Sequence, residues 1–264
     1  MQKLSKETID ATGFNKIQSN LSSLANSESN KNYFKNIIPN KNLKQLTEHI
    51  SLSDIIYQEL IKRKNIDISV LGNMYDILSK IKIEGSFLSE AEFQRLHNTL
   101  EINFKLENIL SNSVFKSWKK LQTIKTNKKW IKLIEQKFDE NFQIKINASK
   151  ELFKLFEQKK LIEKKIEKKM AEHYENAKKK KWLQNENISW INERSVLPFK
   201  VSLKNKIQGI IHQHSSSGKT AFIEPLDIVK LNNTKNQNEF DIHIEKKKIL
   251  LELTSFFNQI SKKI

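Results

Sequence analysis

Apolar side chains recur every three or four residues over most of this sequence, which is the period of an amphipathic helix. In the first half of the chain, the pattern predicts a pair of helices within 6–35 and a further helix from Asn40 to Leu60. Pro39 separates them, because proline cannot continue a helix. The helical period is lost over 62–75, and this stretch is predicted to be a loop.

Helical spacing then resumes. A short helix is predicted over Met74–Lys82. Ser89 and Glu92 have the spacing of a capping box, in which each side chain accepts the backbone N–H of the other residue. We therefore expect Ser89 to precede a longer helix that reaches Leu110. The segment Asp139–Asn147 is predicted to be a connection with short extended pieces.

The next stretch, Ala148–Lys181, contains neither glycine nor proline, and its apolar residues form one narrow, heptad-like stripe. One narrow stripe predicts one partner helix, and the last segment repeats apolar residues at a similar spacing. The predicted fold is mainly α. It has a helical core at 1–147 and an out-and-back arm of two long antiparallel helices, at about 148–181 and 228–264.

A β-like tip at 190–227 separates the two long helices. Apolar positions alternate over Ser195–Leu203, and Ala221–Ile223 is a further short apolar run. The sequence HSSSGKT, at 214–220, predicts a turn between the last two of two or three antiparallel strands. The arm is therefore expected to carry a small antiparallel β tip.

Composition adds a strong positive charge to this picture. The net charge is +17, from 47 Lys and Arg against 30 Asp and Glu, and such a charge favours polyanionic partners. A coding bias toward Lys and Asn would produce the same excess. The only arginines are Arg63, Arg95 and Arg194, which disfavours base-specific readout. The absence of cysteine excludes disulfides and Cys–zinc sites.

Two candidate chemistries in the tip are rejected. A phosphate-binding loop needs a glycine where Gln213 stands, and SSSGKT leads into a predicted strand instead of a helix. His212 and His214 would share one face of a strand and could ligate a metal, with Glu224 and Asp227 further along the chain. No third ligand has suitable spacing, so exposed polar residues at a hairpin end are the favoured interpretation. No catalytic, cofactor-binding or metal-binding residue is predicted.

The lysines of the long helix alternate with glutamates and indicate a solvated face, except at its end. Trp182 and Trp190 could stack on bases, although packing of the tip onto the arm is the favoured role.

No apolar run reaches the length of a membrane helix, so a soluble cytoplasmic protein without membrane contact is expected. The candidate nucleic-acid contacts are Lys178, Lys179, Lys180, Arg194, Lys200, Lys204, Lys206 and Lys219.

The segment 209–233, GIIHQHSSSGKTAFIEPLDIVKLNN, resembles the signature of the second bacterial branch of the MutS family, which is linked to suppression of recombination and to ribosome rescue. NERSVLPFKV, ending at Val201, is similar to the family sequence just upstream, and weaker likeness covers most of the chain. Gln213 and His214 depart from the family, which commonly has Asp and a variable residue there.

The resemblance implies a helical core, two lever helices and a β clamp that meets nucleic acid, either duplex or branched DNA or ribosomal RNA. It also implies a homodimer of the full-length protein. The ATPase and nuclease regions of the family have no counterpart here, so a fragment, a truncated gene or a split protein is expected, without enzymatic activity of its own. The alternatives are a helical self-association module whose basicity reflects coding bias and, third, an enzyme.

Overall fold

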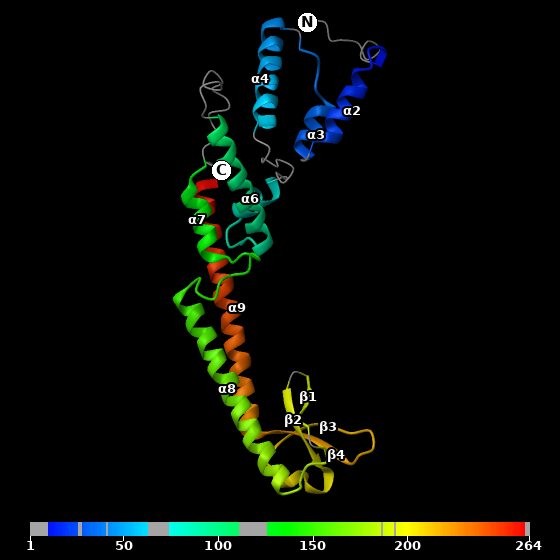
Figure 1. Ribbon diagram of the computed structural model, residues 1–264, viewed down its shortest axis with the longest axis vertical. Coiled ribbons are helices and arrows are strands. Elements are labelled where there is room, and N and C mark those ends of the chain that lie inside the picture. Colours follow the sequence, from blue (N-terminus) through cyan, green and yellow to red (C-terminus); the bar gives the residue numbers. More distant parts are fainter. Residues whose placement is uncertain are drawn as a thin grey trace. The chain divides into compact units, whose positions relative to one another are not determined.

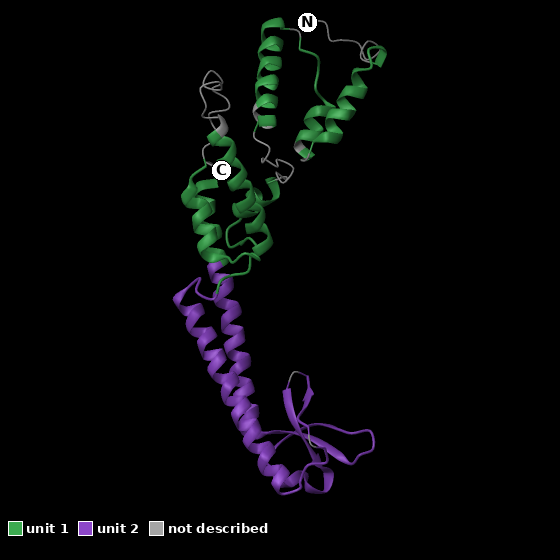
Figure 2. Cartoon of the chain, in the orientation of Figure 1, with its two compact units in different colours: residues 1–145, 250–264 green, residues 146–249 purple. Residues whose placement is uncertain are grey.

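The structure, a computed structural model, describes residues 10–25, 28–40, 42–62, 74–110, 126–185, 187–192 and 194–261. It is mainly helical with one small four-stranded antiparallel sheet, which confirms the predicted fold class (Figure 1). The chain forms two compact units (Figure 2). Unit 1 comprises 1–145 and 250–264, and unit 2 comprises 146–249. Most of the loop predicted over 62–75 lies outside the described residues.

The first helices that lie within the described part of unit 1 are α2 (Phe14–Leu24), α3 (Glu28–Lys35) and α4 (Leu43–Lys62). The predicted pair within 6–35 is confirmed for its described part. The Ser22 hydroxyl in α2 donates to the backbone carbonyl of Lys31 in α3 at 3.2 Å, which links the two helices.

Further along the described part of unit 1 lie α5 (Tyr75–Ile81), α6 (Glu90–Leu110) and α7 (Lys128–Lys137). The predicted capping box is confirmed at the start of α6. The backbone N–H of Ser89 donates to Glu92 Oε2 at 2.7 Å, and that of Glu92 donates to Ser89 Oγ at 3.3 Å. Together these bonds satisfy two backbone donors that the helix itself leaves without partners.

The core of unit 1 is centred on Phe93 in α6, which is fully buried. Its ring centroid lies 5.4 Å from that of Phe138 and 6.2 Å from that of Phe257. The backbone N–H of Leu88 donates to Oγ1 of Thr254 at 3.0 Å, across a sequence separation of 166 residues. The last turns of helix α9 (Leu226–Ile260) therefore contribute to this core.

The arm of unit 2 consists of α8 (Lys150–Lys179) and the first part of α9 (Leu226–Ile260), which lie side by side in Figure 1. Lys159 Nζ lies 2.8 Å from Glu239 Oε1, and Asn238 Nδ2 donates to the backbone carbonyl of Leu155 at 3.2 Å. The predicted pairing of two long antiparallel helices is confirmed. The stripe on α8 is buried at Leu152, Leu155, Met170 and Ala177.

The sheet has strand order β1-β2-β4-β3 with antiparallel pairing throughout. Its strands are β1 (Ser189–Ile191), β2 (Arg194–Lys200), β3 (Gly209–His214) and β4 (Thr220–Pro225). Four strands replace the two or three expected. The turn predicted between the last two strands is confirmed.

The alternation predicted through Leu203 was wrong beyond Lys200, because the chain then forms a 3₁₀ helix, η4 (Val201–Lys206). Burial in β2 does not alternate either, since its central five residues are all buried. The apolar residues of η4 continued the spacing of a strand by coincidence, so sequence pattern alone could not locate the end of β2.

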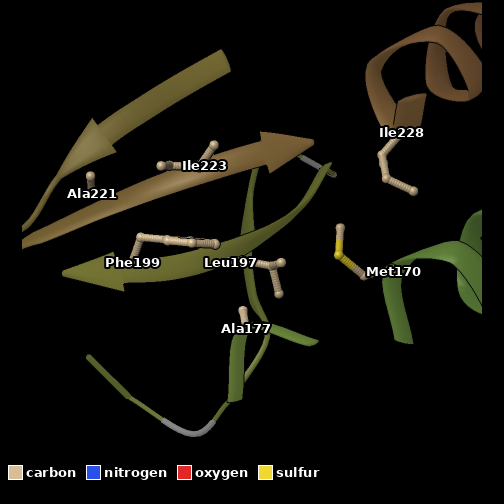
Figure 3. Close-up of a cluster of buried hydrophobic side chains, with 7 residues drawn as sticks. All are labelled: Met170, Ala177, Leu197, Phe199, Ala221, Ile223 and Ile228. Atoms are coloured by element: carbon tan, nitrogen blue, oxygen red, sulfur yellow. The ribbon is translucent and has the colours of Figure 1, made fainter. Parts of the chain in front are cut away.

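One face of the sheet packs onto the arm through a cluster of buried side chains (Figure 3). Trp182 packs against this cluster, with its ring centroid 6.2 Å from that of Phe199, which confirms its predicted packing role. Trp190 is 71% exposed, so the same expectation was wrong for that residue. The cluster comprises Met170 and Ala177 from α8, Leu197 and Phe199 from β2, Ala221 and Ile223 from β4, and Ile228 from α9.

The carboxylate of Glu224 in β4 is completely buried and is bound from three other elements. Arg194 in β2 donates to both of its oxygens at 3.1 and 3.0 Å, His212 Nε2 in β3 lies 2.6 Å from Oε2, and Asn232 Nδ2 in α9 donates to Oε1 at 2.6 Å. The expectation that His212 and Glu224 are exposed polar residues was therefore wrong. A buried carboxylate needs such partners to offset its lost hydration.

Gly209 lies directly against this strand. A Cβ atom at Gly209 would lie 2.3 Å from the backbone carbonyl oxygen of Glu224, closer than any real contact allows. Only glycine permits β3 to approach β4 at this point. The requirement for glycine here thus comes from backbone proximity and not from an unusual φ angle.

A second interhelical contact lies at the start of α9. Asp227 Oδ2 is 3.0 Å from Lys169 Nζ, and Asp227 Oδ1 is 2.8 Å from His173 Nε2. Burial alone would raise the pKa of Asp227, but the hydrogen bonds and charges of Lys169 and His173 outweigh it and hold the pKa below its ordinary value of 3.8. The ionised carboxylate is therefore the form that stabilises the arm.

Replacing Glu224 with Ala should lower the free energy of unfolding by about 3–5 kcal/mol, because Arg194 would lose its buried counter-charge and His212 and Asn232 would each lose a hydrogen-bond partner. Urea unfolding followed by far-UV circular dichroism measures the loss. Glu175→Ala, at an exposed position on α8, is the control and should change the same free energy by less than about 0.5 kcal/mol. Equal effects of the two substitutions would contradict the structural role of Glu224.

Asp227→Asn should destabilise the protein at about pH 5, where the wild-type carboxylate is ionised. Because the side chain is 38% exposed, solvent screening limits the loss to about 0.5–1 kcal/mol. Because the pKa of Asp227 is lower in the folded protein than its ordinary value of 3.8, the carboxylate gives its full stabilisation above about pH 3.8. This stabilisation is lost as the pH falls through the pKa of the folded protein. Unfolding free energies measured over this pH range should therefore converge for the two proteins, and a gap that stays constant would refute the assignment. Asp54→Asn, on the exposed surface of α4, serves as the control.

Candidate nucleic-acid interface

Three of the predicted contacts lie where α8 ends. Lys178 and Lys179 are in its last turn, Lys180 caps it, and all three are exposed. Lys178 Nζ lies 5.8 Å from the ring centroid of Tyr174, and Lys180 Nζ lies 4.6 Å from that of Trp182. These cation–π contacts orient the amines without neutralising their charge.

Two further segments reach the same end of β2. Lys204 and Lys206 lie in η4, and Lys219 lies in the turn between β3 and β4. The backbone N–H of Val201 donates to the carbonyl of Lys219 at 3.1 Å, which joins the turn to η4. Lys200 Nζ donates to the backbone carbonyl of Lys181 at 3.1 Å, which joins β2 to the end of α8.

These contacts bring together all of the predicted lysines, from three separate segments. Together with the adjacent Lys181, these lysines form a surface that we call the basic tip. Within the described part of the chain, Lys179, Lys206 and Lys219 form no ion pair. From 178 to 219 the sequence holds nine Lys and Arg residues but only two Glu. The basic tip comprises Lys178–Lys181, Lys200, Lys204, Lys206 and Lys219.

Arg194 is the predicted contact that the structure does not place with the others. It lies at the opposite end of β2, half-buried, where it binds Glu224 and donates to Asn233 Oδ1 at 3.3 Å. Glu224 stands in the apolar run AFIEP, and a lone acid in such a strand is the signal that could have indicated a buried ion pair.

The SSSGKT segment forms a hairpin turn that leads into β4 and not into a helix, as predicted. The backbone N–H of Ser215 donates to the carbonyl of Thr220 at 2.9 Å, and that of Gly218 donates to the carbonyl of Ser215 at 2.8 Å. Gly218 has a φ of 69°, in the left-handed region that favours glycine. The turn therefore presents Lys219 from a hairpin and lacks the helix N-terminus of a phosphate-binding loop.

Sequence reasoning missed the strand that carries Trp190. β1 has only three residues, and it pairs Trp190 with Ser195 of β2. The resulting exposed indole lies in unit 2 together with the basic tip.

None of the helices among the described residues is long and apolar enough to cross a membrane.

No protein-family model matches the chain. It is, however, similar to several proteins named Endonuclease MutS2. The protein from Caldicellulosiruptor bescii is 26% identical over 260 residues, which cover 96% of this chain and 32% of the relative. The protein from Aquifex aeolicus is 26% identical over 257 residues, covering 95% and 33%. The protein from Carboxydothermus hydrogenoformans is 29% identical over 231 residues, covering 84% and 29%.

The chain spans about a third of the length of the curated relatives that it matches. The similarity covers both units and is not confined to the segment 209–233. Nearly the whole chain is therefore similar to about one third of a MutS2-type protein.

Proposed function

We propose that this chain is the core, lever and clamp segment of a MutS-like protein of the recombination-control and repair type, and that its basic tip binds nucleic acid without sequence specificity. The observation that carries the proposal is the convergence of lysines from α8, η4 and the β3–β4 turn at one end of β2. Similarity to the MutS2 proteins supports it independently.

The chemistry of the basic tip favours phosphate contacts over base contacts. Lysine is a flexible point charge that binds phosphate and releases condensed counterions, whereas bidentate reading of guanine is usually the work of arginine. The one arginine of unit 2, Arg194, already binds Glu224. The proposed ligand is therefore a nucleic acid recognised by its phosphate backbone, either duplex or branched DNA or ribosomal RNA.

In the complete protein, the arm would act together with an ATPase. ATP hydrolysis would be supplied by another segment or a partner chain, and the arm would connect that activity to the nucleic acid. The complete protein would act as a homodimer. The apolar stripe of α8 supports a lever role over self-association through that stripe, because α9 of the same chain already covers it.

The test is binding of a fluorescently labelled DNA duplex at a series of salt concentrations. For the wild-type protein, the logarithm of the association constant should fall linearly with the logarithm of the salt concentration, by about 0.9 for each phosphate contacted. Lys179→Glu, Lys206→Glu and Lys219→Glu combined should weaken binding to every sequence alike and reduce this slope. The matched control combines Lys164→Glu, Lys165→Glu and Lys168→Glu, which change the net charge equally at exposed positions along α8.

Equal losses in the two triple variants would show that the net charge and not the basic tip attracts DNA. Absent or salt-independent binding would favour the self-association module, which sedimentation of the wild-type protein would then reveal as a dimer. Competition by branched DNA and by ribosomal RNA against the labelled duplex distinguishes the possible targets.

A further inference from the structure

A second cluster of polar side chains lies in unit 1, between α6 and α7. It consists of His97 and Glu101 in α6 and Glu135 in α7. His97 and Glu101 are four residues apart and so lie on the same face of their helix. One ligand atom from each of the three side chains lies within 4.8 Å of the other two.

The spacing between His97 and Glu135 is long for a direct ion pair. Their Nε2 and Oε1 atoms are 3.4 Å apart, whereas a charge-assisted hydrogen bond measures about 2.7–2.9 Å. Two ligand atoms on a tetrahedral zinc ion, each about 2.0–2.2 Å from the metal, are themselves about 3.4 Å apart. The observed distance therefore fits two ligands of one ion.

The charges around the cluster also favour a cation. Within the described part of the chain, Glu101 forms no hydrogen bond or ion pair, and the carboxylate of Glu135 meets only His97. Lys145 reaches the backbone carbonyl of Glu135 at 2.7 Å and forms no ion pair with its carboxylate. Among the described residues, neither carboxylate therefore has a Lys or Arg partner, and a cation could bind there without displacing one.

Because His97 is largely buried, only one of its two ring nitrogens can bind an ion. The residue is only 9% exposed, and its ring lies edge-on to that of Phe142, with centroids 5.3 Å apart. Its Nδ1 is buried and has no hydrogen-bond partner among the described residues, so Nε2 is the nitrogen that faces the carboxylate. Glu135 is 51% exposed, which leaves a path from solvent to the cluster.

We propose that His97, Glu101 and Glu135 bind one divalent transition metal ion of the zinc type, with water in the fourth position, and that this ion links α6 to α7. The imidazole favours zinc over calcium and magnesium, which prefer sets made of oxygen alone. The proposal is independent of nucleic-acid binding by the basic tip.

The experiment is calorimetric titration of chelator-treated protein with Zn²⁺, followed by thermal unfolding with and without the ion. One ion should bind per chain, and the melting temperature should rise because the ion binds the folded state. Glu101→Gln and His97→Gln should each weaken binding by more than about tenfold, since loss of outer-shell partners alone costs that much. Co²⁺ in place of Zn²⁺ should give visible absorption typical of a tetrahedral site.

Glu101→Gln is the decisive variant, because a conservative change at a residue without described partners should leave the fold intact. Circular dichroism checks that it does. The control variant combines His49→Gln with Glu140→Gln, both at exposed positions in unit 1, and should bind the ion normally. Failure of the wild-type protein to bind, or binding that both Glu101→Gln and His97→Gln retain, overturns the proposal.

Discussion

The arrangement of unit 2 depends on the burial of one carboxylate. Glu224 has no access to water, so donors must reach it from the surrounding elements, and β2, β3 and α9 each supply one. The backbone must therefore place these donors within hydrogen-bond distance of Glu224. The pairing of β3 with β4 shifts register between Ile211 and Gln213, and His212, which lies at that irregularity, reaches the acid. Asn232 lies two turns into α9, so the direction in which that helix leaves the sheet is fixed by the same group.

The same constraint separates two roles along β2. Its first residue, Arg194, is committed to the buried acid, while its last, Lys200, holds the end of α8 beside η4. The charge left at the surface therefore belongs to lysines, and the tip lacks the rigid guanidinium that base reading requires. The buried ion pair and the exposed positive charge thus lie at opposite ends of one strand.

The sequence predicts those parts of the fold that have a period or a local signal. The stripe on α8, the capping box at Ser89 and the hairpin turn before Thr220 all act over a few residues, and each is found in the structure. The parts it does not predict act over long separations or lack a period. Arg194 and Glu224 are 30 residues apart, His97 and Glu135 are 38 apart, and β1 is too short to alternate. Spacing shows which residues share a helix face, but it does not show which helices meet.

The two parts of helix α9 pack in different units, which the spacing of its apolar residues does not predict. Its periodic apolar residues predict a helix that pairs with α8, and its first part does so through Asn238. Its last part serves a different core. Phe257 lies against Phe93, and Thr254 accepts the N–H of Leu88, both in unit 1. The core of unit 1 therefore includes side chains from the end of α9, more than 100 residues beyond α7 in the sequence. One continuous helix therefore contributes residues to both units.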